Sequence, residues 1–207
     1  MAAGEGNRFG GQKQFAELAG RAVVSMALEA ARSVSSGVVV VVPPSIPEAE
    51  FESFAEADHV VRGGRTRADS VRAGLAAVPQ EAEIVVVHDA ARPLAPPGLF
   101  EAVVRAVCEG ADGAVPALRV ADTLKRVEGD VVVATVPRDD LVAVQTPQAF
   151  RAEVLRRAHA GSHDATDDAA LLERLGAIVR VVKGEPSNLK LTEPEDLVVL
   201  EALIARS

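Results

Sequence analysis

The chain is poor in cysteine and in large aromatic side chains: its 207 residues include one cysteine and neither tryptophan nor tyrosine. A single thiol, Cys108, excludes an intramolecular disulfide and fits a reducing compartment, so we predict a cytoplasmic protein. Because Cys108 lies in an apolar helical pattern, we expect its thiol to be buried. Without tryptophan or tyrosine, the chain offers few platforms on which single-stranded nucleic acid stacks.

A surplus of positive charge is also lacking, since the formal net charge is −8. Nucleic-acid binders normally carry a basic surplus, so we predict no nucleic-acid partner. No apolar run approaches the roughly 20 residues of a membrane-spanning helix, and no signal-peptide pattern opens the sequence, so we predict no membrane partner. The histidines are scattered and form no zinc-like cluster.

Short apolar runs alternate with amphipathic helical patterns along most of the chain. The patterns predict strands at 38–42, 60–61, 84–87, 113–117 and 177–182, and helices at 21–33, 45–57, from about 69 to 78, 96–109, 151–159, 164–175 and from 192 to about 205. This alternation predicts one α/β domain over residues 1–207 with a doubly wound, mostly parallel sheet. Hydrophobic residues make up 48% of the chain, which suits one full core.

The alternation is interrupted by a β-hairpin pattern within about 118–138. Two strand patterns, 122–127 and 131–136, flank a turn at Glu128-Gly129-Asp130, with no helix between them. An extended hairpin of this kind often serves as a dimer arm, so we predict a homodimer.

The strand pattern Ile84–Val87 is followed by His88-Asp89-Ala90-Ala91-Arg92-Pro93. In open α/β sheets, ligands bind just beyond the carboxyl ends of the strands. Asp89 and Arg92 are therefore candidates for handling a metal ion and an anionic substrate. We interpret His88 as a packing residue and not as a base.

Two glycine-containing segments are candidate phosphate or nucleotide contacts. The first, residues 2–14, adds Arg8 and Lys13 to its glycines, with a frayed terminus as the alternative. It matches neither the dinucleotide fingerprint nor the Walker A loop. The second, Gly63–Val71, combines a glycine turn, arginines and a helix start; ordinary N-capping by Asp69 or Ser70 is the alternative.

These segments resemble the 2-C-methyl-D-erythritol 4-phosphate cytidylyltransferase family, whose fold is nucleoside-diphosphate-sugar-transferase-like. The resemblance extends from Ala2 to Leu197. The matching blocks are Ala-Ala-Gly-x-Gly-x-Arg at 2–8, Lys13-Gln14, 63–71, 87–93, Asp122-Thr123-x-Lys125, Thr146-Pro147-Gln148, Thr166-Asp167 and 188–197. The ribitol-5-phosphate cytidylyltransferases are similar at most of these blocks and supply an alternative acceptor.

The resemblance implies transfer of CMP from CTP to 2-C-methyl-D-erythritol 4-phosphate, with release of pyrophosphate, in non-mevalonate isoprenoid biosynthesis. It implies that Arg8 and Lys13, with Mg²⁺, stabilise charge on the α-phosphate, and that Arg138 and Lys190 position the acceptor phosphate. The implied substrate-binding residues are Ala2, Ala3, Gly4, Gly6, Gly64, Ser70, Asp89, Thr123, Thr146 and Thr166. Asp89 contacts either the acceptor hydroxyls or the metal, and Thr123 and Arg138 flank the hairpin and reach the partner's site.

The sequence departs from the family at its beginning. The apolar strand that precedes Ala-Ala-Gly in the family is absent, and Met1 stands at its last position. We hypothesise that the start codon is assigned too late. If 207 residues are the whole chain, we expect poor stability and weak activity, and an inactive nucleotide-binding or dimerisation module is the second alternative.

Overall fold

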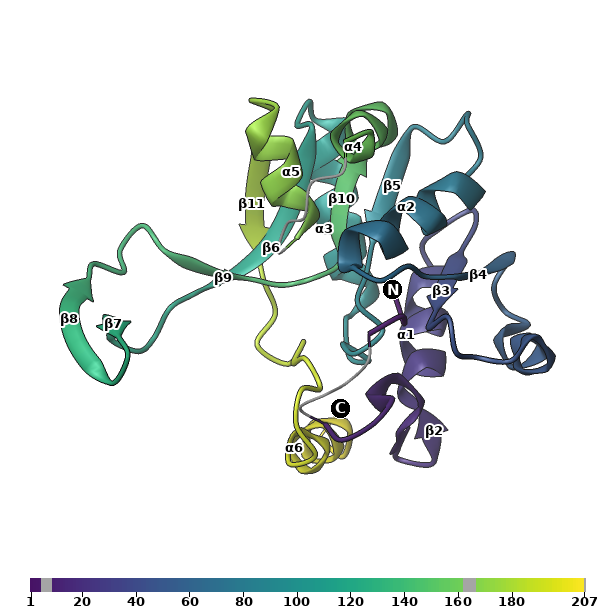
Figure 1. Cartoon of the computed structure of the whole chain (residues 1–207), viewed down its shortest axis with the longest axis horizontal. Coiled ribbons are helices and arrows are strands. Elements are labelled where there is room, and N and C mark those ends of the chain that lie inside the picture. Colours follow the sequence, from purple (N-terminus) through teal and green to yellow (C-terminus); the bar gives the residue numbers. More distant parts are fainter. Residues whose placement is uncertain (5–8, 162–166, 207) are drawn as a thin grey trace.

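The computed structural model describes residues 1–4, 9–161 and 167–206. Its largest sheet has the strand order β11-β6-β10-β5, and β9 also pairs with β6 (Figure 1). These strands are β5 Ile84–Val87, β6 Gly113–Arg119, β9 Val142–Val144, β10 Gln148–Arg151 and β11 Val179–Lys183. Strand β11 is parallel to β6, and β10 is antiparallel to both β6 and β5. Since β5, β6 and β11 are parallel, the predicted α/β class with a mostly parallel sheet is confirmed.

Helices α2 Arg67–Ala77, α4 Ala152–His159 and α5 Asp168–Arg174 cover one face of this sheet, and α3 Pro97–Cys108 covers the other. Two further helices, α1 Val23–Arg32 and α6 Asp196–Ile204, pack in separate apolar clusters, α1 with β3 and α6 with β1. Ala114 and Ala149 pack in one apolar cluster with residues of α3, whereas Val115 and Phe150 pack in another with residues of α2, α4 and α5. Successive strand residues point to opposite faces, so the two clusters are the two layers of a doubly wound fold.

Some elements differ from the sequence-based predictions. Strands β9 and β10 lie in a segment for which no strand is predicted, because polar residues and Pro147 interrupt the apolar pattern there. The helix predicted over 45–57 is a 3₁₀ helix, η2 Glu48–Phe54. Cys108 is exposed, so its predicted burial is wrong: it is the last residue of α3, whose buried face is formed upstream. Short elements near the N-terminus are η1 Lys13–Phe15, β1 Glu17–Leu18 and β2 Arg21–Ala22.

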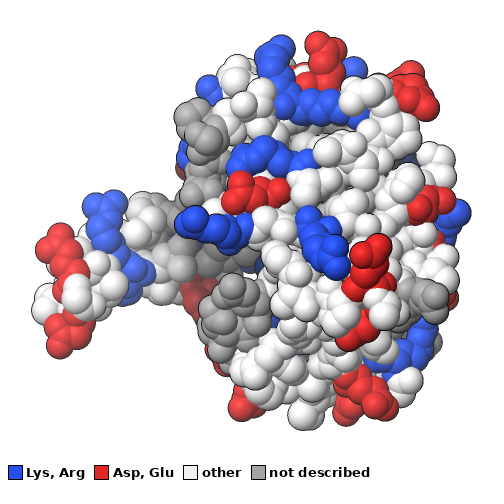
Figure 2. Space-filling view, turned by 45° about the vertical axis from the view of Figure 1, so that its right-hand side comes forward, with Lys and Arg blue, Asp and Glu red and all other residues white. Residues whose placement is uncertain are grey.

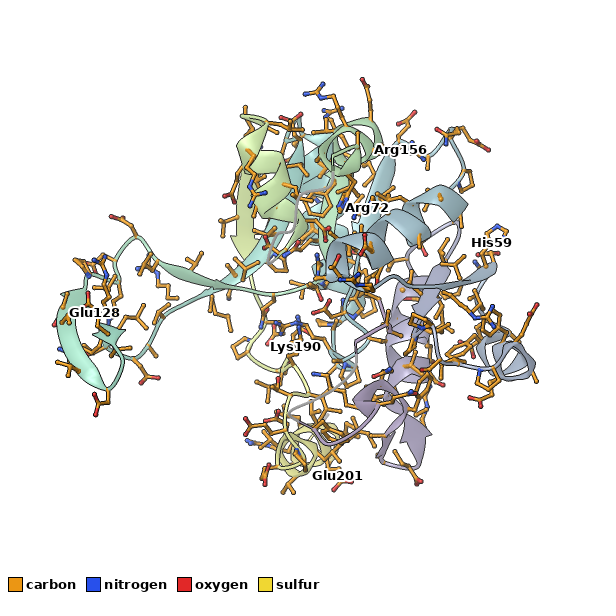
Figure 3. All side chains as sticks on the ribbon, viewed as in Figure 1. His59, Arg72, Glu128, Arg156, Lys190 and Glu201 are labelled. Atoms are coloured by element: carbon orange, nitrogen blue, oxygen red, sulfur yellow. The ribbon has the colours of Figure 1, made fainter. Side chains whose placement is uncertain are left out.

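The predicted hairpin is present and projects away from the rest of the molecule (Figure 1). Strand β7 Leu124–Glu128 pairs antiparallel with β8 Val131–Val136. Gly129 in the turn has φ +60°, a backbone conformation that favours glycine. Figure 3 shows Glu128 at the outer end of this hairpin, far from Lys190. We call residues 118–138 the arm.

Two further strands are separate from the main sheet. Strand β3 Val39–Val42 pairs in parallel with β4 His59–Arg62, and neither pairs with β5. A cavity of about 840 Å³, which we call the strand slot, is lined by 38–41 on one side and 84–87 on the other. Among the described residues, no strand lies between β3 and β5. The absence of the family's first strand stays a prediction.

The first two residues close one end of the strand slot. The Met1 nitrogen donates to the His88 oxygen at 2.5 Å, and the Ala90 N–H donates to the Met1 oxygen at 2.9 Å. On the other side, the Ala2 N–H donates to the Val41 oxygen at 2.8 Å. Bonding to residues on both sides of one neighbour is the pattern of a parallel ladder. Met1 and Ala2 therefore connect the carboxyl ends of β3 and β5.

In protein whose first residue is Met1, the α-amino group of Met1 is expected to make stability depend on pH. Burial lowers the pKa of this group from 8.0 to about 6. Between those values the unfolded chain binds more protons than the folded chain, so stability rises with pH. We expect a gain of about 2 kcal/mol in the free energy of unfolding from pH 6 to pH 8. Urea titrations of protein shown by mass to retain Met1 measure it, and N-terminal acetylation should remove the slope.

Candidate functional site

A second cavity, of about 660 Å³, lies where the chain leaves the carboxyl ends of β4 and β5. We call it the site cavity. The predicted site residues that line it are Ala2, Ala3, Gly4, Lys13, Gly64, Ser70, Asp89, Thr146 and Lys190. Segments from both ends of the chain and from its middle therefore meet in one place.

Other predicted site residues are not in this cavity. Gly6, Arg8 and Thr166 lie outside the described residues. Thr123 and Arg138 lie on the arm and do not line the site cavity, and the Arg138 guanidinium donates to the backbone oxygen of Ala121. In this one chain, the two arm residues and Lys190 therefore do not form a common site.

The glycine turn before α2 forms one wall of the site cavity. A Cβ on Gly63 would lie 2.6 Å from Ser70 Oγ and 2.7 Å from the Ala3 Cβ, so only glycine fits there. The Gly64 N–H donates to Ser70 Oγ at 3.2 Å. The helix is capped by Thr66, whose side chain accepts from the Asp69 N–H, so the predicted cap at Asp69 or Ser70 is wrong. Asp69 instead completes a capping box, which leaves Ser70 to hold the turn.

Asp89 and Lys190 form an ion pair in the site cavity. Lys190 Nζ lies 2.6 Å from Asp89 Oδ2, although more than 100 residues separate them in the chain. Burial by itself raises the pKa of the Asp89 carboxyl, but the charge and hydrogen bond of Lys190, with Arg67 beyond it, hold that pKa well below its usual range. Asp89 is therefore ionised at neutral pH, and Lys190 is held by a carboxylate that a substrate phosphate must displace or share.

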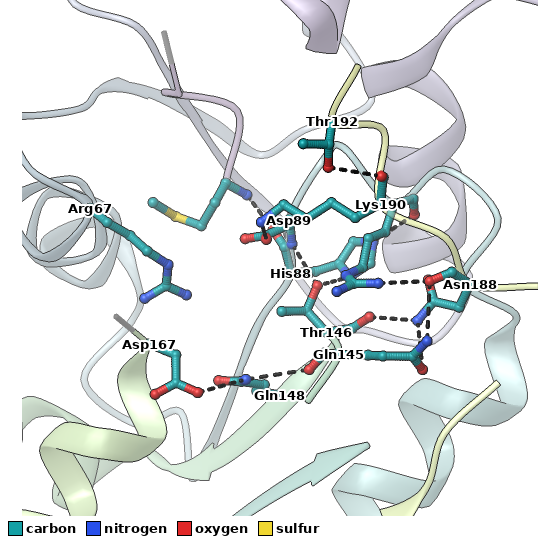
Figure 4. A network of polar contacts seen from close by, with 12 residues as sticks. Arg67, His88, Asp89, Gln145, Thr146, Gln148, Asp167, Asn188, Lys190 and Thr192 are labelled. Atoms are coloured by element: carbon teal, nitrogen blue, oxygen red, sulfur yellow. Dashed lines mark hydrogen bonds and ion pairs between the residues drawn. The ribbon is translucent and has the colours of Figure 1, made fainter. Parts of the chain in front are cut away.

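Several residues of the site cavity are absent from the predicted site, among them Arg67, Gln148 and Asp167. Each of these three lies in a segment that carries the family resemblance, but none was given a role in substrate binding. Asp167 caps α5 through the Ala170 N–H, as expected of a charge at a helix start. Figure 4 shows Arg67, Asp167 and Gln148 on one side of the polar network, with Lys190 and Asn188 on the other.

Arg67 is held by a buried carboxylate. Its Nη2 lies 2.7 Å from Asp168 Oδ2, and the other Asp168 oxygen lies 2.9 Å from His159 Nε2. The Asp168 side chain is fully buried. Burial by itself raises the pKa of Asp168, but hydrogen bonds and charge from His159 and Arg67 hold it below its usual value. Asp168 therefore joins α2, α4 and α5.

Removal of the Asp168 charge is expected to destabilise the fold. Asp168→Asn leaves Arg67 and His159 without their shared carboxylate, which costs about 3 kcal/mol for a buried pair. Thermal unfolding should show a Tm lower by roughly 6–12 °C. The control is Glu29→Gln, because its ion pair with Arg21 is exposed and should change stability by less than about 1 kcal/mol. Equal effects of the two substitutions would contradict the expectation.

Arg92 has a structural role here. Its Nη1 donates to the Asn188 backbone oxygen at 2.7 Å, and its own backbone oxygen lies 3.2 Å from His88 Nε2. Asn188 is fully buried, and its Nδ2 donates to the Thr146 oxygen at 2.9 Å. Arg92 thus joins the turn after β5 to the loop that carries Lys190.

The site cavity is richer in cations than the overall charge suggests. Lys13, Arg65, Arg67, Arg92 and Lys190 line it, against the carboxylates of Asp89 and Asp167. Figure 2 shows Lys and Arg side chains gathered at the centre of the visible face, beside acidic ones. This arrangement attracts a polyanion such as a nucleotide triphosphate.

Carboxylates around the site cavity are few. Within residues 1–4, 9–161 and 167–206, no group of three or more His, Cys, Asp or Glu side chains is arranged to hold a metal ion. Asp89 offers one hard oxygen donor, which suits an Mg²⁺ ion that keeps phosphate and water ligands.

Within the described residues, no helix is long and apolar enough to cross a bilayer.

Comparison with known proteins gives one consistent result. A family model described as 2-C-methyl-D-erythritol 4-phosphate cytidylyltransferase matches residues 1–206. The enzyme of that name from Frankia casuarinae is 44% identical over 99% of this chain and 79% of its own length. The one from Rhodococcus jostii is 46% identical over 98% of this chain and 92% of its own. The crystal structure of the Thermus thermophilus enzyme has a TM-score of 0.82 at 38% identity and covers 94% of each chain.

Proposed function

Because the chain belongs to the 2-C-methyl-D-erythritol 4-phosphate cytidylyltransferase family, we propose that it transfers CMP from CTP to 2-C-methyl-D-erythritol 4-phosphate in non-mevalonate isoprenoid biosynthesis. The observation that supports this function is one cavity in which the glycine turn at 63–64, Lys13 and the Asp89–Lys190 pair meet. The turn suits the nucleotide, and the two lysines suit the two reacting phosphates.

The reaction needs positioning and charge more than acid–base chemistry. An oxygen of the acceptor phosphate attacks the α-phosphorus of CTP in line, a new P–O bond forms, and the bond to the β-phosphate oxygen breaks to release pyrophosphate. The attacking phosphate monoester is ionised at neutral pH, so no base has to remove a proton. Lys13 and Arg8 stabilise the negative charge that grows on the α-phosphate, and Lys190 holds the acceptor phosphate.

A magnesium ion fits this site with few protein ligands. Bound mainly by triphosphate oxygens, Mg²⁺ would neutralise charge on the transferring phosphate, with Asp89 as the protein carboxylate within reach. The same Asp89 oxygens suit the acceptor hydroxyls. Lys190 is released from Asp89 in either case, and becomes available to the acceptor phosphate.

A homodimer with composite sites is part of the proposal. The arm exposes Val127, Val131 and Val132, each with more than half of its surface accessible, and it projects away from the body of its own chain. Apolar side chains in this position suit burial against a second copy. Arg138 and Thr123, at the base of the hairpin, then belong to the site cavity of the partner.

Mixing two inactive variants tests the composite site. Lys13→Ala disables the body of a subunit and Arg138→Ala disables its arm. In a heterodimer, the intact body of one subunit meets the intact arm of the other, so mixtures should recover about a quarter of wild-type activity. Each variant alone is the control. If the mixture stays inactive although sedimentation shows heterodimers, Arg138 does not act across the interface.

A substrate panel tests the function itself. With CTP and Mg²⁺, we expect pyrophosphate release with 2-C-methyl-D-erythritol 4-phosphate and far less with ribitol 5-phosphate. Turnover with ribitol 5-phosphate alone would overturn the proposed acceptor. Binding of CTP without product from either alcohol would identify an inactive nucleotide-binding module. A cytoplasmic location stays a prediction of the single-thiol composition.

A further inference from the structure

We propose that His88 is a positioning residue that accepts the hydrogen bond donated by the Thr146 hydroxyl and so leaves Thr146 able only to accept a hydrogen bond from the substrate. At this position the site cavity then recognises a hydroxyl group of the acceptor alcohol and not a phosphate oxygen. This proposal rests on the proposed function. It differs from the phosphate-binding role that the family resemblance implies for Thr146.

The first step is the protonation of the His88 ring. Its Nε2 lies 3.2 Å from the Arg92 backbone oxygen. A carbonyl oxygen only accepts hydrogen bonds, so Nε2 carries a proton. The ring is buried, and its two nitrogens contact the Arg92 carbonyl oxygen and the Thr146 hydroxyl oxygen and not a carboxylate. A buried imidazole with neutral partners of this kind stays neutral, so its Nδ1 carries no proton.

The second step is the direction of the Thr146 hydroxyl. His88 Nδ1 lies 3.1 Å from Thr146 Oγ1, and both side chains are buried. Since Nδ1 has no proton, the Thr146 hydroxyl donates a hydrogen bond to Nδ1. The Asp89 N–H donates to the same Thr146 oxygen at 3.0 Å. The Thr146 hydroxyl thus donates to His88 and accepts from the Asp89 N–H. Its second lone pair is left to accept a hydrogen bond from a substrate donor.

The third step is the rigidity of this arrangement. The His88 ring packs on Phe100 with 5.1 Å between ring centroids. The Thr146 backbone oxygen accepts from Asn188 Nδ2, and the Asn188 backbone oxygen accepts from Arg92 Nη1. Figure 4 shows His88, Asp89 and Thr146 together at the centre of this network. Because both partners are held, rotation of the hydroxyl would break its bond to the ring.

The consequence is selective recognition. A phosphate oxygen needs a donor, and Thr146 has no proton to offer, so a phosphate there would face a lone pair. An alcohol hydroxyl donates and is accepted. A site that binds a substrate hydroxyl in this way discriminates against an analogue without it. Lys190 is left to bind the phosphate, so different residues recognise the hydroxyl end and the phosphate end of the acceptor.

Kinetics of variants test the recognition. Thr146→Val and His88→Phe should each raise KM for the acceptor about 10- to 100-fold, with KM for CTP unchanged. The double variant should be no worse than Thr146→Val, because His88 acts through the hydroxyl. Thr146→Ser keeps the hydroxyl and His88→Asn keeps an acceptor near Nδ1, so both should retain most of the affinity. Additive effects, or equal changes in the two KM values, would overturn the proposal.

¹⁵N NMR of the labelled histidine side chains gives a readout that needs neither turnover nor a folded His88→Phe variant. The His88 resonances should show the Nε2–H tautomer from pH 5 to pH 8, and Thr146→Val should shift Nδ1 selectively. If the wild-type protein transfers no CMP, the proposed function fails and this spectrum alone decides the role of His88. An Nδ1–H tautomer, or no effect of Thr146→Val, would overturn it.

Discussion

Lys13→Ala is expected to lower kcat for CMP transfer by about a hundred- to a thousandfold, the loss found when one preorganised charge or donor is removed from a transition state. Lys13, at the start of η1, lines the site cavity together with Gly64 of the glycine turn. Its charge is needed most when the α-phosphate gains negative charge. KM for the acceptor should therefore change little, and steady-state pyrophosphate release measures both constants.

The matched control is Lys183→Ala. Lys183 is an exposed residue of β11 and does not line the site cavity, so this substitution removes the same charge without touching the site. We expect wild-type kinetics from it. Lys13→Arg should retain part of the activity, because the positive charge remains. A Lys13→Ala protein that folds normally and keeps more than about a tenth of the wild-type kcat would remove Lys13 from the chemistry.

The second large effect is expected in the strand slot. Fusion of five apolar, β-branched residues directly before Met1 should raise Tm by on the order of 10 °C. In the part of the chain that the structure describes, neither β3 nor β5 pairs with a strand on its side of the slot, and Met1 and Ala2 already set the register and direction of a strand parallel to both. Each buried valine or isoleucine contributes about 1.5–3 kcal/mol, against about 1–2 kcal/mol for ordering a residue.

The fused segment should also remove the buried titratable group at Met1. The bond from the Met1 nitrogen to the His88 oxygen remains, but a peptide N–H replaces the amino group, whose pKa burial lowers to about 6. The control is a Gly-Ser segment of the same length, which supplies the peptide bond without apolar side chains. If both segments give the same Tm, the slot does not accept a strand. A higher kcat with the apolar segment is expected, because it tethers Ala2–Gly4 at the nucleotide wall.

The prediction from sequence succeeded where the signal is local. The valine run at 38–42, the Ile84 strand and the arm were readable because strand patterns depend on neighbours within a few residues. Strands β9 and β10 were not, because the sheet imposes an extended conformation on a polar, proline-containing segment. Whether the Cys108 thiol is buried likewise depends on what packs against α3.

The sequence by itself determined the class of fold, the arm, the family and nine residues of the site cavity, because glycines, charges and their order along the chain are sufficient for these. The tertiary structure alone decided which charges meet. It placed Lys190 on Asp89, joined Arg67 to the buried Asp168, and set the proton of Thr146 toward His88. These contacts join residues far apart in the chain, so no local pattern encodes them, and burial then fixes which groups hold charge and protons.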